Sequence, residues 1–186
     1  CNQHNWLMML DEIQTGNGRT GKYFAYQHTN IVPDVMTTAK GLGNGFPIGA
    51  VMTQGKAVGL LGAGSHGSTY GGTVLGSRVV YTVIDTLQKE NAVENAATVG
   101  TYIVEQLKTE LAEHNVQVRG FGMMIGIQLP KDCPELVAIA RDEYQLIVNV
   151  TAGSVVRLLP PLNLTQDQAD ELLKRLVPAI KNFLKA

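Results

Sequence analysis

One lysine, Lys40, stands between two apolar runs, and this arrangement constrains the fold more than any other stretch. The runs cover residues 34–40 and 47–53, and the loop between them carries three alternating glycines, Gly41, Gly43 and Gly45. Glycines let a backbone pass close to another group without side chains in the way. We therefore expect two strands joined by a tight loop, the first of them buried over Val35–Ala39, with Lys40 at its end.

The chemistry of Lys40 follows from this position. Most lysines are solvated surface charges, and that is the simplest interpretation of any single lysine. Partial burial at a strand end would keep the amine unprotonated, and an unprotonated amine can attack a carbonyl group. The flanking sequence thus favours a lysine that forms a Schiff base with a carbonyl ligand.

The composition excludes several classes of partner. The net charge of the 186 residues is −1, which gives no electrostatic basis for binding nucleic acid or an anionic membrane. No apolar run reaches the length that spans a bilayer. Cys1 and Cys133 have neither metal-site spacing nor a disulfide framework, which is typical of a reducing compartment. We expect a cytoplasmic protein without a metal site.

A second apolar run, Trp6–Leu10, ends in Asp11 and Glu12. Such a run is typical of a central parallel strand that is covered on both faces. Ligands of open α/β sheets bind outside the carboxyl ends of the strands, so Asp11 is placed to meet one. The alternative is that Asp11 only terminates the strand.

Residues 16–21 match the pattern G-x-G-x-x-G, so a nucleotide-binding oxidoreductase domain is the alternative from another class. The match is weak because four residues separate Asp11 from Gly16, whereas the fingerprint places its first glycine at the strand-to-helix turn. The following segment is too short for a crossover helix, and no acidic residue stands about 20 positions further on. A second match at residues 62–67 also leads into no helix.

The rest of the chain reads as alternating helices and strands. We expect helices over residues 74–90, 91–114 and 134–144, and strands over 119–129, 146–150 and 155–159. Thr165 is the expected N-cap of a last helix that ends at Leu184. Residues 1–73 then form part of a larger sheet domain, 74–90 a linking helix and 91–186 a smaller α/β domain. Because the chain starts at Cys1, close to a strand, we expect it to be part of a longer polypeptide.

Taken together, several ordered motifs resemble the class III (omega) aminotransferases, which use pyridoxal 5′-phosphate. The pattern is most similar to the acetylornithine and succinylornithine aminotransferase subgroup, over the C-terminal part of such an enzyme. The resemblance implies an α/β fold of type I among enzymes dependent on this cofactor. The motifs are Leu10–Gly16, Gly18–Gly21, Pro33–Asp34, Ala39–Gly41, Gly45–Ala50, His66–Gly72 and Arg157–Leu162.

The resemblance also implies roles for individual residues. Asp11 would pair with the protonated pyridine nitrogen of the cofactor, and Lys40 would hold the cofactor and shuttle a proton. Gln14 would reach the phenolic oxygen of the ring from the same segment as Glu12 and Ile13. The remaining implied contacts are Thr69 with the cofactor phosphate of the neighbouring subunit, Ser68 with the substrate, and Arg157 with a substrate carboxylate.

Simpler interpretations exist for some of these residues. Ser68 and Thr69 could form an ordinary turn, and Arg157 could belong to a buried ion pair. Arg19 and His66 read as structural residues. The subgroup has Asn-Pro where this chain has Thr73-Val74, and we expect Thr73 to cap the following helix instead.

The resemblance implies a homodimer that moves the δ-amino group of an acylated ornithine to 2-oxoglutarate, as in arginine biosynthesis. Ornithine, succinylornithine, γ-aminobutyrate and diamines are the alternative donors within the family. A non-catalytic remnant that keeps only the fold is a further alternative. The sequence shows no helix-opening glycine loop that would cradle a phosphate, so we expect these 186 residues alone to be catalytically incomplete.

Overall fold

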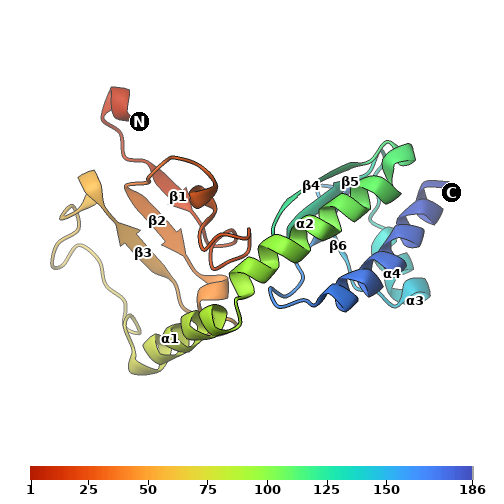
Figure 1. Cartoon of the computed structure of the whole chain (residues 1–186). Helices are drawn as coiled ribbons and strands as arrows, with labels where there is room; N and C mark the ends of the chain where they lie inside the picture. Colours follow the sequence, from red (N-terminus) through yellow and green to blue (C-terminus); the bar gives the residue numbers. More distant parts are fainter. Residues whose placement is uncertain (186) are drawn as a thin grey trace.

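The computed structural model describes residues 1–185, which form two small sheets connected by two consecutive helices (Figure 1). In the first sheet the strand order is β1-β2-β3, with β1 parallel to β2 and β3 antiparallel to it. The strands are β1 (Met9–Asp11), β2 (Val35–Thr38) and β3 (Ala50–Thr53). Short 3-10 turns flank them: η1 (Asn2–His4), η2 (Ala25–His28), η3 (Lys40–Leu42) and η4 (Gly55–Ala57).

The second sheet has the order β4-β5-β7-β6, and all of its neighbouring strands are antiparallel. Its strands are β4 (Gln117–Phe121), β5 (Met124–Gln128), β6 (Asn149–Thr151) and β7 (Val155–Leu158). The helices are α1 (Val74–Lys89), α2 (Ala92–Glu110), α3 (Leu136–Tyr144) and α4 (Gln166–Lys185), with a short turn η5 (Ala112–His114). Within residues 1–185 no helix combines the length and the apolar character needed to cross a bilayer.

Most of the apolar core lies in the C-terminal unit, where α2, α3 and α4 pack with the second sheet. Helix α2 supplies its buried face to this core. The large side chains of the core that are completely or almost completely buried include Ile103, Leu107, Ile125, Ile127, Val156, Leu176 and Ile180. Cys133 is buried in the same core, and burial raises the pKa of its thiol. This unit therefore has the continuous hydrophobic core expected of a stable α/β structure.

Two helices begin at the predicted caps. The Thr73 hydroxyl accepts a hydrogen bond from the Gly76 backbone N–H at 3.4 Å at the start of α1. At the start of α4 the Thr165 hydroxyl accepts from the Gln168 N–H at 3.3 Å, and the Gln168 side chain accepts from the Thr165 N–H at 3.0 Å. These bonds satisfy N–H groups that have no partner within the helix, and they confirm both predicted caps.

The prediction of one strand over residues 119–129 is wrong. The structure has two antiparallel strands there, β4 and β5, paired so that Phe121 lies opposite Met124. The chain reverses at Gly122, whose φ of +53° suits glycine and few other residues. The apolar residues on both sides of this turn made the two strands look continuous in the sequence.

The predicted central strand at Trp6–Leu10 also needs correction. Strand β1 starts later, at Met9, and it lies at an edge of the three-stranded sheet. Trp6 is 65% exposed and Met9 is 68% exposed, so this run is not covered on both faces in the chain described. The run is strand-forming only where it can pair with β2.

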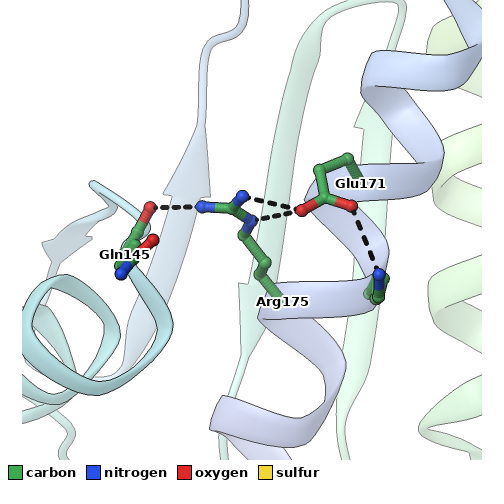
Figure 2. A network of polar contacts seen from close by, with 4 residues as sticks. Gln145, Glu171 and Arg175 are labelled. Carbon is green, nitrogen blue, oxygen red and sulfur yellow. Dashed lines mark hydrogen bonds and ion pairs between the residues drawn. The ribbon is translucent and has the colours of Figure 1, made fainter.

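Helices α3 and α4 are joined by a polar contact that ends α3 (Figure 2). Gln145 caps the C-terminus of α3 in the left-handed conformation. Arg175 of α4 donates to the Gln145 carbonyl oxygen at 2.9 Å and to a Glu171 carboxylate oxygen at 2.7 Å. The hydrogen bond from Arg175 is the main reason why the pKa of Glu171 is lowered.

The loop that follows β1 contacts the C-terminal unit through direct backbone packing. The loop at Gly21, the hairpin turn at Gly122 and helix α2 at Gly100 approach one another with no side chain between them. A Cβ atom on Gly100 of α2 would overlap the carbonyl oxygen of Gly122. A Cβ atom on Gly122 would in turn lie 2.5 Å from the Gly21 nitrogen, and one on Gly21 would lie 2.8 Å from Ala97 of α2. Only glycine permits this three-way approach of the loop, the hairpin turn and the helix.

Arg19 adds polar contacts to the same junction. The Arg19 guanidinium donates to the carbonyl oxygens of Met123 at 3.2 Å and Pro160 at 2.5 Å. The Met123 N–H donates back to the Arg19 carbonyl at 2.9 Å. Burial lowers the pKa of the Arg19 guanidinium. These contacts agree with the predicted structural role of Arg19.

Replacing Gly100 by alanine tests the close contact between α2 and the hairpin turn. Helix propensity alone favours Gly100→Ala by about 1 kcal/mol. The overlap with a backbone carbonyl opposes it, because backbone cannot move aside as a side chain can, so we expect a net loss of about 2 kcal/mol or more in unfolding free energy. Chemical denaturation measures the change.

Gly76→Ala in α1 is the matched control. The nearest atoms to its new Cβ are side-chain ends, Ile48 Cδ1 at 3.1 Å, Thr73 Oγ1 at 3.1 Å and Phe46 Cε1 at 3.3 Å. These can shift, so we expect a change within about 1 kcal/mol. Equal effects of the two substitutions would contradict the proposed backbone contact.

Arg19→Met should destabilise the protein, because it leaves the carbonyls of Met123 and Pro160 without their charged donor. Hydrogen bonds to a charged group contribute about 1.5–3 kcal/mol, and we expect a loss in that range in urea denaturation. Arg141→Met is the control, since Arg141 is exposed and bonds the adjacent Asp142. It should leave stability nearly unchanged, and a similar loss in both variants would argue against the junction role of Arg19.

Candidate functional site

Asp11 and Lys40, the two residues predicted to lie at strand ends, are at the same edge of the first sheet. Strands β1 and β2 are parallel, and Asp11 is in register with Thr37. Lys40 follows Thr37 by three residues, directly after β2 ends at Thr38. Because the strands run in the same direction, their carboxyl ends bring Asp11 and Lys40 to the same edge, where ligands of such sheets bind.

Asp11 shapes the chain that follows it. One carboxylate oxygen of Asp11 accepts from the Ile13 backbone N–H at 2.9 Å and from the Thr37 hydroxyl at 3.5 Å. A carboxylate that accepts from the N–H two residues further on forms an Asx-turn. The chain therefore turns immediately after β1, which directs Ile13 and Gln14 along the sheet edge while the Asp11 carboxylate remains exposed.

Ile13, Gln14 and Lys40 line a cleft of about 560 Å³. The opposite walls come from α1, from the start of α2 and from residues 159–163. Such a volume is in the range of sites for small molecules and cofactors. The structure thus brings three of the predicted cofactor residues to one cavity between the first sheet and the two helices.

Lys40 has an unusual backbone conformation. Its φ is +46°, in the left-handed region that residues other than glycine rarely adopt, and it starts the short turn η3. The loop closes tightly behind it, because a Cβ atom on Gly43 would overlap the Phe46 carbonyl oxygen. Residues in such conformations concentrate at functional sites.

The expected partial burial of Lys40 is wrong for this chain. Lys40 is exposed, although Thr38 just before it is only 3% exposed. The side chain extends from the sheet edge into the open cleft, where the described residues leave it accessible to solvent. The backbone on either side of Lys40 is thus closely packed, while its side-chain amine is accessible to a ligand.

Glu12 has a different position from its neighbours. Its carboxylate is 3% exposed and accepts from the backbone N–H groups of Ala25 at 3.0 Å and Tyr26 at 2.8 Å, and from the Thr15 hydroxyl. These bonds fold the loop that presents Ile13 and Gln14. The carboxylate is therefore occupied by the loop, and a contact of Glu12 with a cofactor stays a prediction.

Ser68 and Thr69 are exposed in the long connection between η4 and α1, as is His66. In the described residues they do not line the cleft around Lys40. Within this chain, Ser68 and Thr69 therefore do not lie in the same cleft as Lys40. Their roles toward the substrate and toward the cofactor phosphate of a neighbouring subunit stay predictions.

Arg157 lies in β7, opposite Gly126 of β5 and Asn149 of β6. Its Nε atom is buried and has no hydrogen-bond partner. Among residues 1–185 it also forms no ion pair, so the alternative of a buried ion pair is not supported. A buried donor without a partner is rare, and a ligand that accepts from it would explain its presence.

Two residues near Lys40 were not predicted. Asn17 and Thr38 are each 3% exposed, and the Asn17 side-chain amide donates to the Thr38 hydroxyl at 3.0 Å. The four buried polar or charged side chains of the described chain all lie in this part of the molecule: Glu12, Asn17, Thr20 and Thr38. The only signal in the sequence was the Asn17-Gly18 pair, which favours a turn with positive φ.

The oxidoreductase alternative does not fit the geometry of residues 16–21. The dinucleotide fingerprint needs a helix directly after its glycines, and here turns and bends lead only to the short η2. The glycines serve packing instead, since Gly18 approaches Val93 and Gly21 approaches Ala97 of α2. The pattern is thus accounted for without a nucleotide.

Comparisons with known proteins agree with the motifs. Acetylornithine aminotransferase of Nitrosomonas europaea is 45% identical over 188 residues, which is 100% of this chain and 48% of that protein. Acetylornithine aminotransferase 1 of Bordetella parapertussis is 47% identical over 99% of this chain and 47% of its own length. The chain spans about half the length of the curated relatives it matches.

Solved structures give the same result for the fold. Ornithine aminotransferase from Plasmodium yoelii has a TM-score of 0.92 with 34% identity, over 98% of this chain and 50% of that one. Acetylornithine aminotransferase from Elizabethkingia anophelis has a TM-score of 0.90 with 30% identity, over 98% and 47%. The mixed α/β fold is that of type I enzymes dependent on pyridoxal 5′-phosphate, as predicted. Since the family model for class III aminotransferases also matches residues 1–180, this chain belongs to the class III aminotransferases.

Proposed function

We propose that this chain supplies the lysine and the pyridine-binding carboxylate of an aminotransferase dependent on pyridoxal 5′-phosphate. The observation that carries the proposal is the position of Asp11 and Lys40 at the carboxyl ends of adjacent parallel strands. Gln14 and Ile13 lie with Lys40 on the same cleft. An amine, a carboxylate and an amide at one sheet edge match the aldehyde, the ring nitrogen and the phenolic oxygen of this cofactor.

The residues present fit the cofactor. Lys40 lines the cleft, and the Asp11 carboxylate is exposed at the same sheet edge, although Asp11 itself is not among the residues that line the cleft. The Asn17 Oδ1 is a buried polar atom without a hydrogen-bond partner, and Asn17 lines the cleft, as expected of a site that a ligand completes. The Arg157 Nε is also buried and unpaired, but Arg157 does not line this cleft in the described chain. Lys40 would hold the cofactor, Asp11 and Gln14 would contact its ring, and Thr69 of a second subunit would contact its phosphate.

When bound, this cofactor supplies an electron sink for the carbon that loses a proton. The chain supports that chemistry in three ways. Asp11 would keep a proton on the ring nitrogen by its negative charge, and Lys40 would accept and return a proton as a general base and acid. Ile13 gives the cleft an apolar wall, beside which electrostatic interactions are stronger than in bulk water.

We propose N-acetylornithine as amino donor and 2-oxoglutarate as acceptor, in a homodimer. The names of the curated relatives support the acetylated donor, whereas ornithine aminotransferases are among the solved structures with the same fold. Both donors and the acceptor carry a carboxylate, which Arg157 would bind through two parallel hydrogen bonds in a bidentate interaction. Ornithine is therefore the second candidate donor, and assays with both compounds separate them.

Borohydride reduction of the holoenzyme tests the assignment of Lys40. Reduction fixes the cofactor to the amine that carries it, and peptide mapping by mass spectrometry should find it on Lys40. Lys40→Ala should abolish both turnover and the visible absorbance of the bound cofactor, because no other amine stands at this sheet edge in the described chain. Labelling of Lys22 or Lys56 instead, with Lys40 unmodified, would show that the assignment is wrong.

Arg157→Lys tests the carboxylate site. Lysine keeps the charge but cannot form two parallel hydrogen bonds, so we expect the KM for 2-oxoglutarate to rise roughly tenfold or more, with an unchanged cofactor spectrum. Arg119→Lys is the control, since Arg119 lies on β4 in the same sheet and is exposed. An unchanged KM with a lowered melting temperature in Arg157→Lys would assign Arg157 to folding alone.

A further inference from the structure

Asn17 makes its hydrogen bonds to the two residues that precede Lys40, to the side chain of Thr38 and to the backbone of Ala39. Its side-chain amide nitrogen donates to the Thr38 hydroxyl at 3.0 Å and to the Ala39 carbonyl oxygen at 3.3 Å. Thr38 is the last residue of β2, and Ala39 immediately precedes Lys40. A single buried side chain, 21 residues or more away in the sequence, thus fixes both residues before Lys40.

The Ala39 carbonyl sets the conformation of Lys40. The same oxygen also accepts from the Leu42 N–H at 2.9 Å, which opens the turn η3. The Lys40 carbonyl accepts from the N–H groups of Gly43 at 3.1 Å and Asn44 at 3.0 Å. The peptide planes on both sides of Lys40 are therefore held, and this determines its φ of +46°. A left-handed conformation is unfavourable for a residue with a side chain, so surrounding contacts must impose it.

Asn17 also contacts the chain after Lys40. A Cβ atom built on Gly41 would lie 3.1 Å from the Asn17 Cβ, so Gly41 packs directly against this side chain. We infer that Asn17 is a positioning residue for Lys40: it clamps the backbone before and after Lys40 and so aims the amine into the cleft. This inference rests on the proposed function, in which Lys40 carries the cofactor.

The stability of the fold does not account for Asn17. Its Oδ1 atom is buried and has no hydrogen-bond partner among the described residues, and an unsatisfied buried acceptor destabilises a fold. This cost is of the same order as the stabilisation from the two hydrogen bonds that the amide donates, so the two effects largely cancel. The amide therefore acts mainly on the geometry of the residues around Lys40, and geometry is what the test must measure.

Asn17→Asp keeps the shape of the side chain and removes both N–H donors. Asn17→Gly removes the side chain without adding charge and accepts the φ of +56° that Asn17 has. Asn115→Asp is the matched control, because Asn115 has a φ of +52° and is exposed far from Lys40 in the sequence. Both Asn17 variants and the control are prepared as holoenzyme and as apoenzyme.

Two readouts separate positioning from stability. In the apoenzyme, amide hydrogen exchange at Leu42, Gly43 and Asn44 should become roughly twofold to tenfold faster in both Asn17 variants, which is the effect of losing one neutral hydrogen bond. The rate at which Lys40 takes up pyridoxal 5′-phosphate should fall by a similar factor relative to exposed Lys22. Borohydride quenching and peptide mapping measure that rate. The melting temperature of Asn17→Gly should stay close to that of Asn115→Asp, whereas Asn17→Asp buries a carboxylate and is compared only in local exchange and labelling.

The outcomes distinguish this inference from the function on which it rests. If the unsubstituted protein takes up the cofactor at Lys40 but both Asn17 variants match Asn115→Asp in exchange and labelling, the inference is overturned while the function stands. If Lys40 is never labelled, the proposed function fails and the inference about its amine fails with it. A general rise in exchange over the whole chain would assign Asn17 to folding and also overturn the inference.

Discussion

Three backbones meet at Gly21, Gly100 and Gly122 with no side chain between them, and the position of the site depends on this contact. The loop that begins at Asp11 carries Ile13, Gln14 and Asn17, and it has little apolar core of its own. Its attachment to helix α2 and to the β4–β5 turn gives it a rigid support in the well-packed C-terminal unit. Glycine is needed at these points because any Cβ would separate the surfaces.

The two units hold their shape by different interactions. In the C-terminal unit, aliphatic side chains from α2, α4 and the second sheet form one continuous core. Around Lys40, buried polar side chains with specific hydrogen-bond partners, such as Glu12 and Thr38, stand beside only a few buried apolar ones, such as Met36 and Leu42. Apolar packing tolerates small shifts, whereas hydrogen bonds are directional. Directional hydrogen bonds therefore fix the positions of residues at the sheet edge around Lys40, whereas apolar packing provides most of the stability of the C-terminal unit.

Local signals explain what was predictable from the sequence. Asp11 and Lys40 each follow an apolar run, and Thr73 and Thr165 each precede a helix, so short-range patterns located them. The hairpin at Gly122 was missed because apolar residues flank a turn that only a positive φ reveals. Asn17 was missed because its partners lie 21 and 22 positions away. The exposure of Lys40 depends on which elements surround the cleft, and no local pattern contains that information.

The Asn17-Gly18 pair has a consequence for the chemical ageing of the protein. Asparagine followed by glycine is prone to deamidation, which begins when the glycine backbone nitrogen attacks the asparagine side-chain carbonyl. Here the Gly18 N–H is bonded to the Tyr23 carbonyl at 3.2 Å, and the Asn17 amide is held by Thr38 and Ala39, so the attacking geometry is blocked. The exposed pair Asn44-Gly45 has no comparable burial, which makes it the site where spontaneous damage to the lysine loop would begin.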